Sequence, residues 1–524
     1  MLLSENPTPV SVDKADSTRM RSKGRLSRWL SHRPGLSTMS IRSKAVARRD
    51  ASTSTSDLAQ DAPPISGDKG YVHFTAVIYD FEGRWRCHIA QLPVEILNEI
   101  FVHCLPPAHG SDKYLSPRIE DAPMLLCHVC SHWRQVASSL VILWTSFSGR
   151  CKELNPRFRT WPNTFELVQR FLDRSKQHPI SIEFGDNTLP TVRKLLFANI
   201  HRWENVSIRL DDLVAKELLG MPAGAATTLD RLSMDASYET ETIIQALPAI
   251  LPLFPNIRHV DFNTIHTNNS IWSNIPWSQL THIQLRCEMP MDECAMFLGQ
   301  CGQARDIQIS SGGDSSEPMA SAITTAMLPY LTHLGISFRD DVGDFLDHFT
   351  LPSLHYLQIS TRPMTPRRNF RALEALAIRS SCVLKKFHLD DFGMLEEDLV
   401  GYLSLPCLRS VEELEIFNFN NMRDQALSLL VYPNAASEVG ILPHLKSLKL
   451  EFPITSDGLF SDMIASRWGK PGCRKSPASI QHVSVAFPRG RFQQRGEVVP
   501  PHDLDILRFA EFTKQGLSIK WEWF

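Results

Sequence analysis

The chain has 524 residues, 43% of them hydrophobic, and a formal net charge of −2. This length allows about three domains, or one small domain followed by a long array of repeats. The near-neutral charge gives no indication of binding to nucleic acid or to an acidic membrane, and no apolar run approaches the roughly 18 residues that span a bilayer.

The 11 cysteines are scattered along the chain and do not suggest a disulfide framework. Several of them, such as Cys104, Cys130 and Cys382, lie within apolar patterns, which is typical of buried, reduced thiols. We therefore expect a cytoplasmic or nuclear protein.

Residues 1–70 are rich in Ser, Thr, Pro, Ala, Lys and Arg and poor in large apolar residues, which predicts a disordered tail. Between Arg19 and Arg49 the tail is strongly basic and contains no acidic residue. Such a tract is compatible with a solvated tail, a nuclear-import signal, a weak phosphate-binding segment or a transit peptide. The acidic residues that precede it argue against a transit peptide. Residues 71–88 are aromatic and β-branched, and we leave them as a linker of unclear role.

Residues 89–150 contain two patterns of apolar residues at helical spacing. Pro93 suits a first helical position because its missing N–H would be unpaired there, and Glu95 suits the first turn, where it meets the positive end of the helix dipole. The expected apolar faces are formed by Ile96, Leu97, Ile100, Phe101, Cys104 and Leu105 in the first segment and by Leu126, Val129, Cys130, Trp133, Ala137 and Leu140 in the second. So small a unit cannot bury this much apolar surface within itself, and we expect a partner to cover it.

This region resembles an F-box, specifically the F-box of mushroom-type fungal proteins. The resemblance rests on three motifs in order: Leu92-Pro93-x-Glu95-Ile96-Leu97-x-x-Ile100-Phe101, then Val129-Cys130-x-x-Trp133-Arg134-x-x-Ala137, then Leu143-Trp144. One departure is the loop over residues 106–123, which is longer than in the commonest F-boxes.

The resemblance implies a partner. Members of the family bind a Skp-type adaptor, which bridges them to a cullin–RING ubiquitin ligase, and the rest of the chain usually selects the substrate. The adaptor-binding residues that the resemblance implies are Leu92, Pro93, Glu95, Ile96, Leu97, Ile100, Phe101, Val129, Cys130, Trp133, Arg134 and Trp144.

Residues 151–524 contain a degenerate repeat. After an expected helix at 163–176 and a strand at 180–184, the unit apolar-x-x-apolar-x-apolar recurs. It begins at Trp203, Leu229, Ile257, Leu280, Ala304, Leu331, Leu354, Leu384, Val411, Leu445 and Ile480. The interval is mostly about 20–35 residues, as in leucine-rich repeats. The last two apolar positions are two apart and therefore face the same side of a strand.

Helices are expected between these strands, at 242–251, 292–299, 342–349 and 396–403, and near the end at 504–512. Gly516 is placed as a helix C-cap before a closing strand. Leu373, Leu376 and Ile378 also fit the template, but they precede Leu384 too closely for a complete repeat, so we assign them to a helix. Alternating strands and helices imply parallel strands with the helices outside. The asparagine or cysteine that usually follows the strand motif is mostly missing, so we expect an irregular solenoid without an asparagine ladder.

The sequence thus predicts an α/β protein with four parts. These are a disordered basic tail (1–70), an unclear linker (71–88), a small helical F-box (89–150) and an irregular leucine-rich-repeat solenoid of parallel strands with outer helices (151–524).

No set of residues suited to catalysis stands out. The segment 127–132, Cys-His-Val-Cys-Ser-His, is the most metal-like cluster, but zinc usually takes two such pairs and the chain has no second CxxC. Cys287, Cys294 and Cys301 suit core packing. The neighbours Asp390 and Asp391 suit a helix N-terminus or a solvated face. We therefore predict no catalytic residue, no cofactor and no metal site, and we predict that the chain is not an enzyme.

With the resemblance, these observations lead us to expect a substrate-recognition subunit of an SCF-type cullin–RING E3 ubiquitin ligase. The F-box would bind the Skp-type adaptor and the concave face of the repeats would bind a target protein. The alternative is a non-ligase protein–protein interaction scaffold built from the same modules. Partners among nucleic acids or membranes are not expected.

Removing residues 1–70 should leave the thermal unfolding midpoint unchanged, because this segment offers little apolar surface to bury. Calorimetry of the full-length and truncated chains measures the difference. A marked fall in the midpoint would show that the segment packs on the rest of the protein.

Overall fold

The structure is a computed structural model. It describes residues 78–79, 85–86, 92–105, 114–150, 164–236, 240–264, 275–311, 325–361, 368–391, 393–417, 422–433, 440–468, 480–488 and 501–523. The predicted tail at 1–70 lies outside these residues. The chain divides into two units, Met1–Ala76 and Val77–Phe524, and the description below concerns the second. No helix in the described part is long and apolar enough to cross a membrane.

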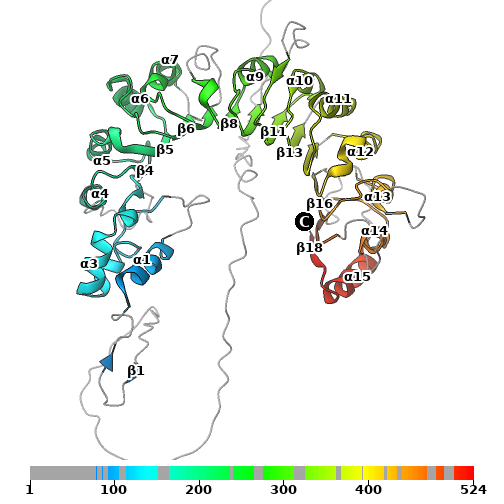
Figure 1. Ribbon diagram of the computed structural model, residues 1–524, viewed down its shortest axis with the longest axis horizontal. Helices are drawn as coiled ribbons and strands as arrows, with labels where there is room; N and C mark the ends of the chain where they lie inside the picture. Colours follow the sequence, from blue (N-terminus) through cyan, green and yellow to red (C-terminus); the bar gives the residue numbers. More distant parts are fainter. Residues whose placement is uncertain are drawn as a thin grey trace, which may run out of the picture. The chain divides into compact units, whose positions relative to one another are not determined.

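A 14-stranded sheet runs through this unit, its strands are all parallel, and strands that are neighbours in the sheet follow one another along the chain. Figure 1 shows the strands on the inner side and the helices on the outer side. The predicted α/β class, a solenoid of parallel strands with outer helices, is confirmed. The strands are β3 (Ser146–Ser148), β4 (Ile180–Phe184), β5 (Trp203–Arg209), β6 (Arg231–Ala236), β7 (His259–Thr264), β8 (His282–Cys287), β9 (Asp306–Ser311), β11 (His333–Phe338), β13 (Tyr356–Thr361), β14 (Lys386–Asp391), β15 (Glu413–Phe417), β16 (Ser447–Glu451), β17 (His482–Phe487) and β18 (Ser518–Trp523).

The helices alternate with these strands. They are α1 (Val94–His103), α2 (Leu126–Val129), α3 (Ser131–Ser139), α4 (Thr164–Arg174), α5 (Pro190–Phe197), α6 (Asp212–Leu219), α7 (Glu241–Ile250), α9 (Met291–Leu298), α10 (Gly343–Asp347), α11 (Arg371–Ser380), α12 (Glu396–Leu403), α13 (Asp424–Leu430), α14 (Leu459–Arg467) and α15 (Asp503–Lys514). Short 3₁₀ helices are η3 (Val141–Trp144), η4 (Ile200–Arg202), η5 (Leu251–Leu253), η6 (Trp277–Gln279) and η7 (Pro406–Ser410).

Most predicted helices are confirmed, including the assignment of residues 373–378 to a helix, α11. The prediction at 342–349 is wrong at its end. Helix α10 stops at Asp347, and Phe349 begins strand β12 (Phe349–Thr350), which pairs in parallel with β10 (Ala326–Met327). In the linker, β1 (Ile78–Tyr79) pairs antiparallel with β2 (Trp85–Arg86).

The repeated apolar positions form the core in register. Leu357 of β13 lies between Leu334 of β11 and Phe387 of β14, and this row continues through Leu414 of β15 and Leu448 of β16. All five side chains are at most 2% exposed. Each strand therefore buries its apolar pair against the same pair of its neighbours, as stacked repeats require.

Polar side chains tie several repeats to the one before them. The hydroxyl of Thr228 donates to the Trp203 carbonyl at 2.8 Å and that of Thr332 to the Arg305 carbonyl at 2.9 Å. Gln279, Ser353 and Ser410 donate in the same way to the carbonyls of Pro255, Pro329 and Leu384. These bonds satisfy carbonyls where the chain turns into each strand, a place where buried backbone groups need partners.

Two predictions about polar residues are wrong. Asp391 is not solvated: it is 1% exposed and forms a bidentate ion pair with buried Arg368, with Nε–Oδ2 at 2.5 Å and Nη2–Oδ1 at 2.8 Å. Ser360 alternates with Leu357 and Ile359 along the strand pattern, which predicts an outward-facing side chain, but it is 8% exposed and donates to Asp390. Both residues lie near the ends of their strands and bond to the neighbouring repeat: Ser360 of β13 bonds to Asp390 of β14, and Asp391 of β14 accepts from Thr361 of β13.

Leu357→Ala should lower the free energy of unfolding by about 2–5 kcal/mol, because it opens a cavity in the continuous apolar row. Gln358→Glu, on the opposite face of the same strand, should change it by no more than about 0.5 kcal/mol. Urea unfolding followed by circular dichroism measures both. Equal effects of the two substitutions would show that this strand does not have one buried face.

Candidate partner-binding surface

Helix α1 presents two different apolar sides. Pro93 precedes the first helical residue, and Glu95 lies in the first turn as predicted. Leu97 and Phe101 are fully buried, whereas Ile96 is 50% and Ile100 38% exposed. The broad apolar face expected from the sequence is therefore divided between the core and the surface.

The second predicted helix is broken at Cys130, which has extended backbone angles of φ −158° and ψ 173°. Helix α2 ends before it, and Cys130 Sγ accepts a hydrogen bond from the Trp133 N–H at 3.4 Å as the N-cap of α3. Cys130 is thus exposed and does not belong to a buried apolar stripe. Arg134 closes the break by donating from Nε to the Cys127 carbonyl at 2.8 Å.

Aromatic side chains hold these helices against the first repeats. Trp133 packs edge-on against Phe101, with ring centroids 4.9 Å apart. Trp144 donates from Nε1 to the Ala137 carbonyl at 2.8 Å and packs edge-on against Phe171 of α4 at 5.0 Å. Arg174 lies over the Trp144 ring, 4.2 Å from its centroid. The helical unit and the start of the solenoid therefore share one core.

The structure separates the adaptor-binding residues implied by the sequence into three groups. Pro93, Glu95, Ile96, Ile100, Val129, Cys130 and Arg134 are exposed, Leu92 and Trp133 are half-buried, and Leu97, Phe101 and Trp144 are fully buried. The buried three support the surface and cannot contact a partner without local unfolding.

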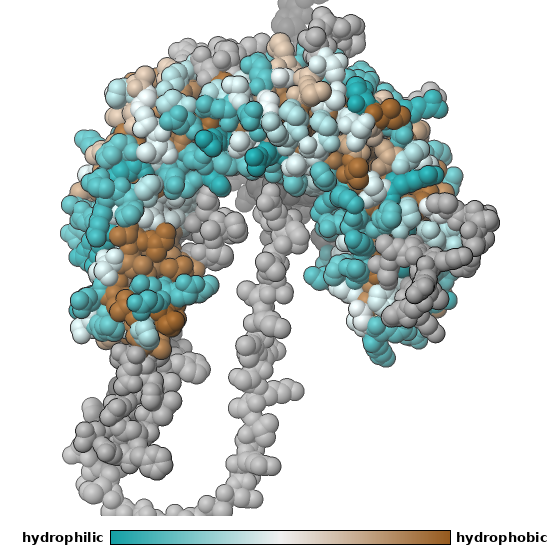
Figure 2. Space-filling model, in the orientation of Figure 1, coloured by the Kyte–Doolittle hydropathy of each residue, from teal (hydrophilic) through white to brown (hydrophobic). Residues whose placement is uncertain are grey.

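Further exposed apolar side chains lie on these and the adjoining elements, and sequence reasoning did not select them. They are Val94, Val102, Ile119, Leu125 and Ile142, each between 37% and 54% exposed. Figure 2 shows apolar side chains gathered over α1 and the neighbouring α3. Their signal in the sequence was weak because Val94 and Val102 lie outside the expected stripe.

The cysteines are only partly as predicted. Cys287, Cys294 and Cys301 are buried, and burial raises the pKa of the Cys287 and Cys301 thiols to about 12. Cys104 is exposed and Cys382 is half-buried, contrary to expectation. Cys104 follows the last turn of α1 on the solvent side.

The inner face of the sheet is polar. Near its N-terminal end a groove of about 220 Å³ is lined by charged side chains of neighbouring strands, among them Glu183, Arg209, Asp235 and Arg286. Most of these charges are paired within the groove: Arg286 binds Asp261 at 2.7 Å and Arg150 binds Glu183 at 2.8 Å. The groove therefore offers hydrogen-bonding groups without a dominant sign of charge.

Farther along this face, His388 and Lys386 bind Glu415 at 3.1 and 2.7 Å. Burial raises the pKa of the Glu415 carboxyl, but these two hydrogen bonds outweigh burial and lower it to about 2. In the described residues, this face therefore presents charged and polar side chains that are suited to polar contacts with a macromolecule.

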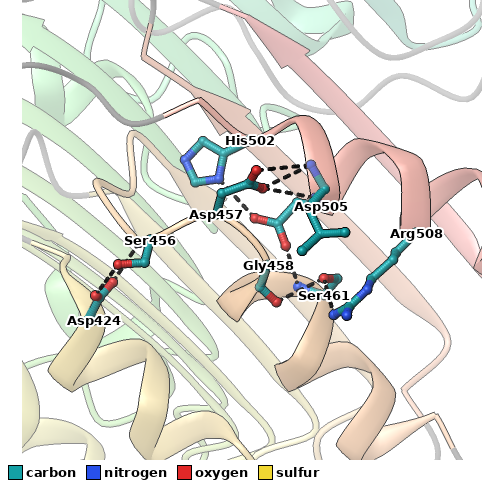
Figure 3. A network of polar contacts seen from close by, with 9 residues as sticks. Asp424, Ser456, Asp457, Gly458, Ser461, His502, Asp505 and Arg508 are labelled. Atoms are coloured by element: carbon teal, nitrogen blue, oxygen red, sulfur yellow. Dashed lines mark hydrogen bonds and ion pairs between the residues drawn. The ribbon is translucent and has the colours of Figure 1, made fainter.

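One cluster in the described residues has metal-like composition. A ligand atom from each of Asp457, His502 and Asp505 lies within 4.8 Å of the others. Figure 3 shows what holds them. Asp457 Oδ1 accepts from the N–H groups of Leu504 and Asp505 at 3.0 and 3.1 Å, at the start of α15. Asp505 accepts from the Ser461 N–H at 2.8 Å, in the first turn of α14, and from His502 Nδ1 at 2.9 Å.

The two carboxylates thus cap two helix N-termini, each acting on the neighbouring helix. The positive ends of the helix dipoles already compensate their charge and would repel a cation placed between them. We assign the cluster to the stability of the last repeats. Sequence reasoning did not find this cluster, because Asp457 and Asp505 lie far apart in the chain.

Comparisons with known proteins do not assign this chain to a family. No family model matches the chain, and no curated protein matches its sequence. Among solved structures, the chain is similar to a structural-genomics protein from Bacteroides fragilis, at 12% identity and a TM-score of 0.27. The match covers 51% of this chain and 64% of that one, which is less than two thirds of its length, and it carries no conclusion about function.

Asp505→Asn should lower the free energy of unfolding at pH 7 by about 1–3 kcal/mol, because Asp505 is a buried, charged acceptor. Burial raises the pKa of this carboxyl, but hydrogen bonds from His502 and Ser461 outweigh burial and hold it below the ordinary value of 3.8. Its stabilising contribution is therefore present above the unfolded-state pKa and is lost as the pH falls through the lower, folded-state pKa.

Urea unfolding between pH 7 and pH 3 checks this. The decline in stability toward acid should be shallower in Asp505→Asn than in the parent chain. Asp503→Asn, in the same turn of α15 but exposed, should retain the parent profile. Identical pH profiles for the parent and Asp505→Asn would contradict the assignment.

Proposed function

We propose that this chain is an F-box protein with leucine-rich repeats that serves as the substrate-recognition subunit of an SCF-type cullin–RING ubiquitin ligase. In this proposal α1 to α3 bind a Skp-type adaptor and the inner face of the repeats binds a target protein. The chain itself catalyses no reaction.

The observation that carries the proposal is the exposed apolar side of α1. Ile96 and Ile100 are one helical turn apart and point to solvent, while Leu97 and Phe101 beside them are fully buried. Exposed apolar residues gathered in one place mark a protein interaction site more often than isolated ones do. The partner proposed is a Skp-type adaptor, because the motif around Pro93 and Trp133 resembles an F-box.

The repeats support the second half of the proposal. A long parallel sheet presents a continuous inner face, and its side chains are mainly polar, as the Tyr356, Gln358 and His388 positions illustrate. Extended faces of this kind are used by repeat proteins to bind other proteins. The target itself is not encoded in a readable pattern, since function resides in particular sites and not in the fold.

The double substitution Ile96→Asp and Ile100→Asp should abolish co-purification of a co-expressed Skp-type adaptor, because it places two charges in the proposed apolar contact. Both side chains are exposed, so the circular dichroism spectrum and thermal midpoint should stay close to those of the parent. The matched control is Ile378→Asp on α11, where the side chain is 70% exposed; it should leave adaptor capture intact.

Two outcomes would count against the proposal. Undiminished capture by the double variant would show that this side of α1 does not bind the adaptor. The second outcome is that the parent chain captures the adaptor, and the variant does not, but the parent is never incorporated into a cullin–RING complex. This outcome would favour a non-ligase scaffold.

A further inference from the structure

In the part of the chain that the structure describes, the last strand of the sheet, β18, has an open edge. One side of it pairs with β17 in parallel register, and within the described residues no strand pairs with its other side. The opposite end of the sheet differs, because the Ser148 N–H of β3 donates to the Leu115 carbonyl at 2.7 Å. An uncovered edge strand is a template for pairing with another strand.

We propose that β18 pairs with β18 of a second copy of this chain, antiparallel and across a two-fold axis at Trp521. A two-fold contact uses the same patch on both copies and closes after two chains. With one end of the sheet covered and the other open, the expected assembly is a dimer and not a filament.

The backbone N–H and C=O groups of β18 are oriented as this pairing requires. The Ser518 N–H donates to the Gln481 carbonyl on the β17 side. Because backbone groups of alternate residues point to opposite edges of a strand, Lys520 and Glu522 also bond toward β17. The N–H and C=O groups of Ile519, Trp521 and Trp523 therefore point to the open edge. A Trp521–Trp521 pair across the axis would exchange two hydrogen bonds, and each Ile519–Trp523 pair would exchange two more.

Charge selects this register. With Trp521 on the axis, Lys520 of each copy opposes Glu522 of the other in a pair without mutual hydrogen bonds, where opposite side chains lie closest. Moving the axis to Lys520 would place two lysines opposite each other, and moving it to Glu522 would oppose two glutamates. The ion pairs between described residues include neither Lys520 nor Glu522, and both side chains are exposed, so both remain available to the second copy.

The apolar side chains of β18 also support this pairing. Ile519, Trp521 and Trp523 continue the apolar rows of β17, where Val483, Val485 and Phe487 are buried. Trp521 occupies a core-side position, yet it is 43% exposed. A second β18 would extend the sheet and place an aromatic side chain beside it, as cross-strand aromatic pairs favour. A single strand pair buries little area, so the dimer should be weak and depend on concentration.

Sedimentation velocity over a range of concentrations tests the proposal on the full-length chain. The parent should dimerise reversibly. Lys520→Glu and Glu522→Lys should each weaken the dimer at least roughly tenfold, because each places two like-charge pairs across the axis. The double variant, with both charges exchanged, should restore the dimer. Lys514→Glu makes the same change of charge on exposed α15 and should leave the parent behaviour.

Circular dichroism should show all four variants folded, which separates loss of pairing from loss of structure. A parent chain that is monomeric at every accessible concentration would overturn the proposal. So would a dimer that neither single charge reversal weakens, or one that the double exchange fails to restore. None of these outcomes bears on adaptor binding at α1, which lies at the other end of the sequence.

Discussion

Every repeat of this protein depends on its neighbours for burial. A strand of six residues with one outer helix cannot cover its own apolar pair, so residues such as Leu357 become core only when the strands on both sides are in register. The same constraint makes the two ends of the sheet special. At the first, Trp144 and Phe171 join the helical unit to the repeats, while at the last Trp521 stays partly exposed. The two interaction surfaces proposed for this chain thus lie next to the first and the last strands of the sheet.

Apolar packing alone would leave backbone carbonyls without hydrogen-bond donors where the chain turns into the strands. Polar side chains supply these donors. Hydroxyl and amide groups, such as those of Thr332 and Gln279, bond carbonyls of the preceding repeat. Because each bond is made by whichever short polar residue stands there, no fixed asparagine is needed. The intervals between strands can then vary, which accounts for an irregular repeat with an unbroken sheet.

Prediction from the sequence succeeded where a pattern repeats and failed where a contact is particular. The apolar spacing of the strands is visible many times over, so strand positions and the parallel class followed from it. The break at Cys130 was hidden because Leu126, Val129 and Trp133 are also spaced as one helix would space them. The burial of Asp391 was hidden because its partner, Arg368, belongs to a different segment of the chain. Such pairings depend on which residues the fold brings together, and no local pattern records this.

Apolar exposure is distributed unevenly over the described residues, and this distribution connects fold to function. In the repeats, the exposed large apolar side chains are spread over many elements, with two on one helix at most, as for Leu504 and Leu507 on α15. Around α1 to α3, in the part of the chain with the fewest strands to pack against, several occur within one short unit. These exposed side chains are not part of the core, because Leu97 and Phe101 already occupy the buried side of α1. Among the described residues, the side of α1 that carries Ile96 and Ile100 is left exposed, and this is the physical reason to look for a partner there.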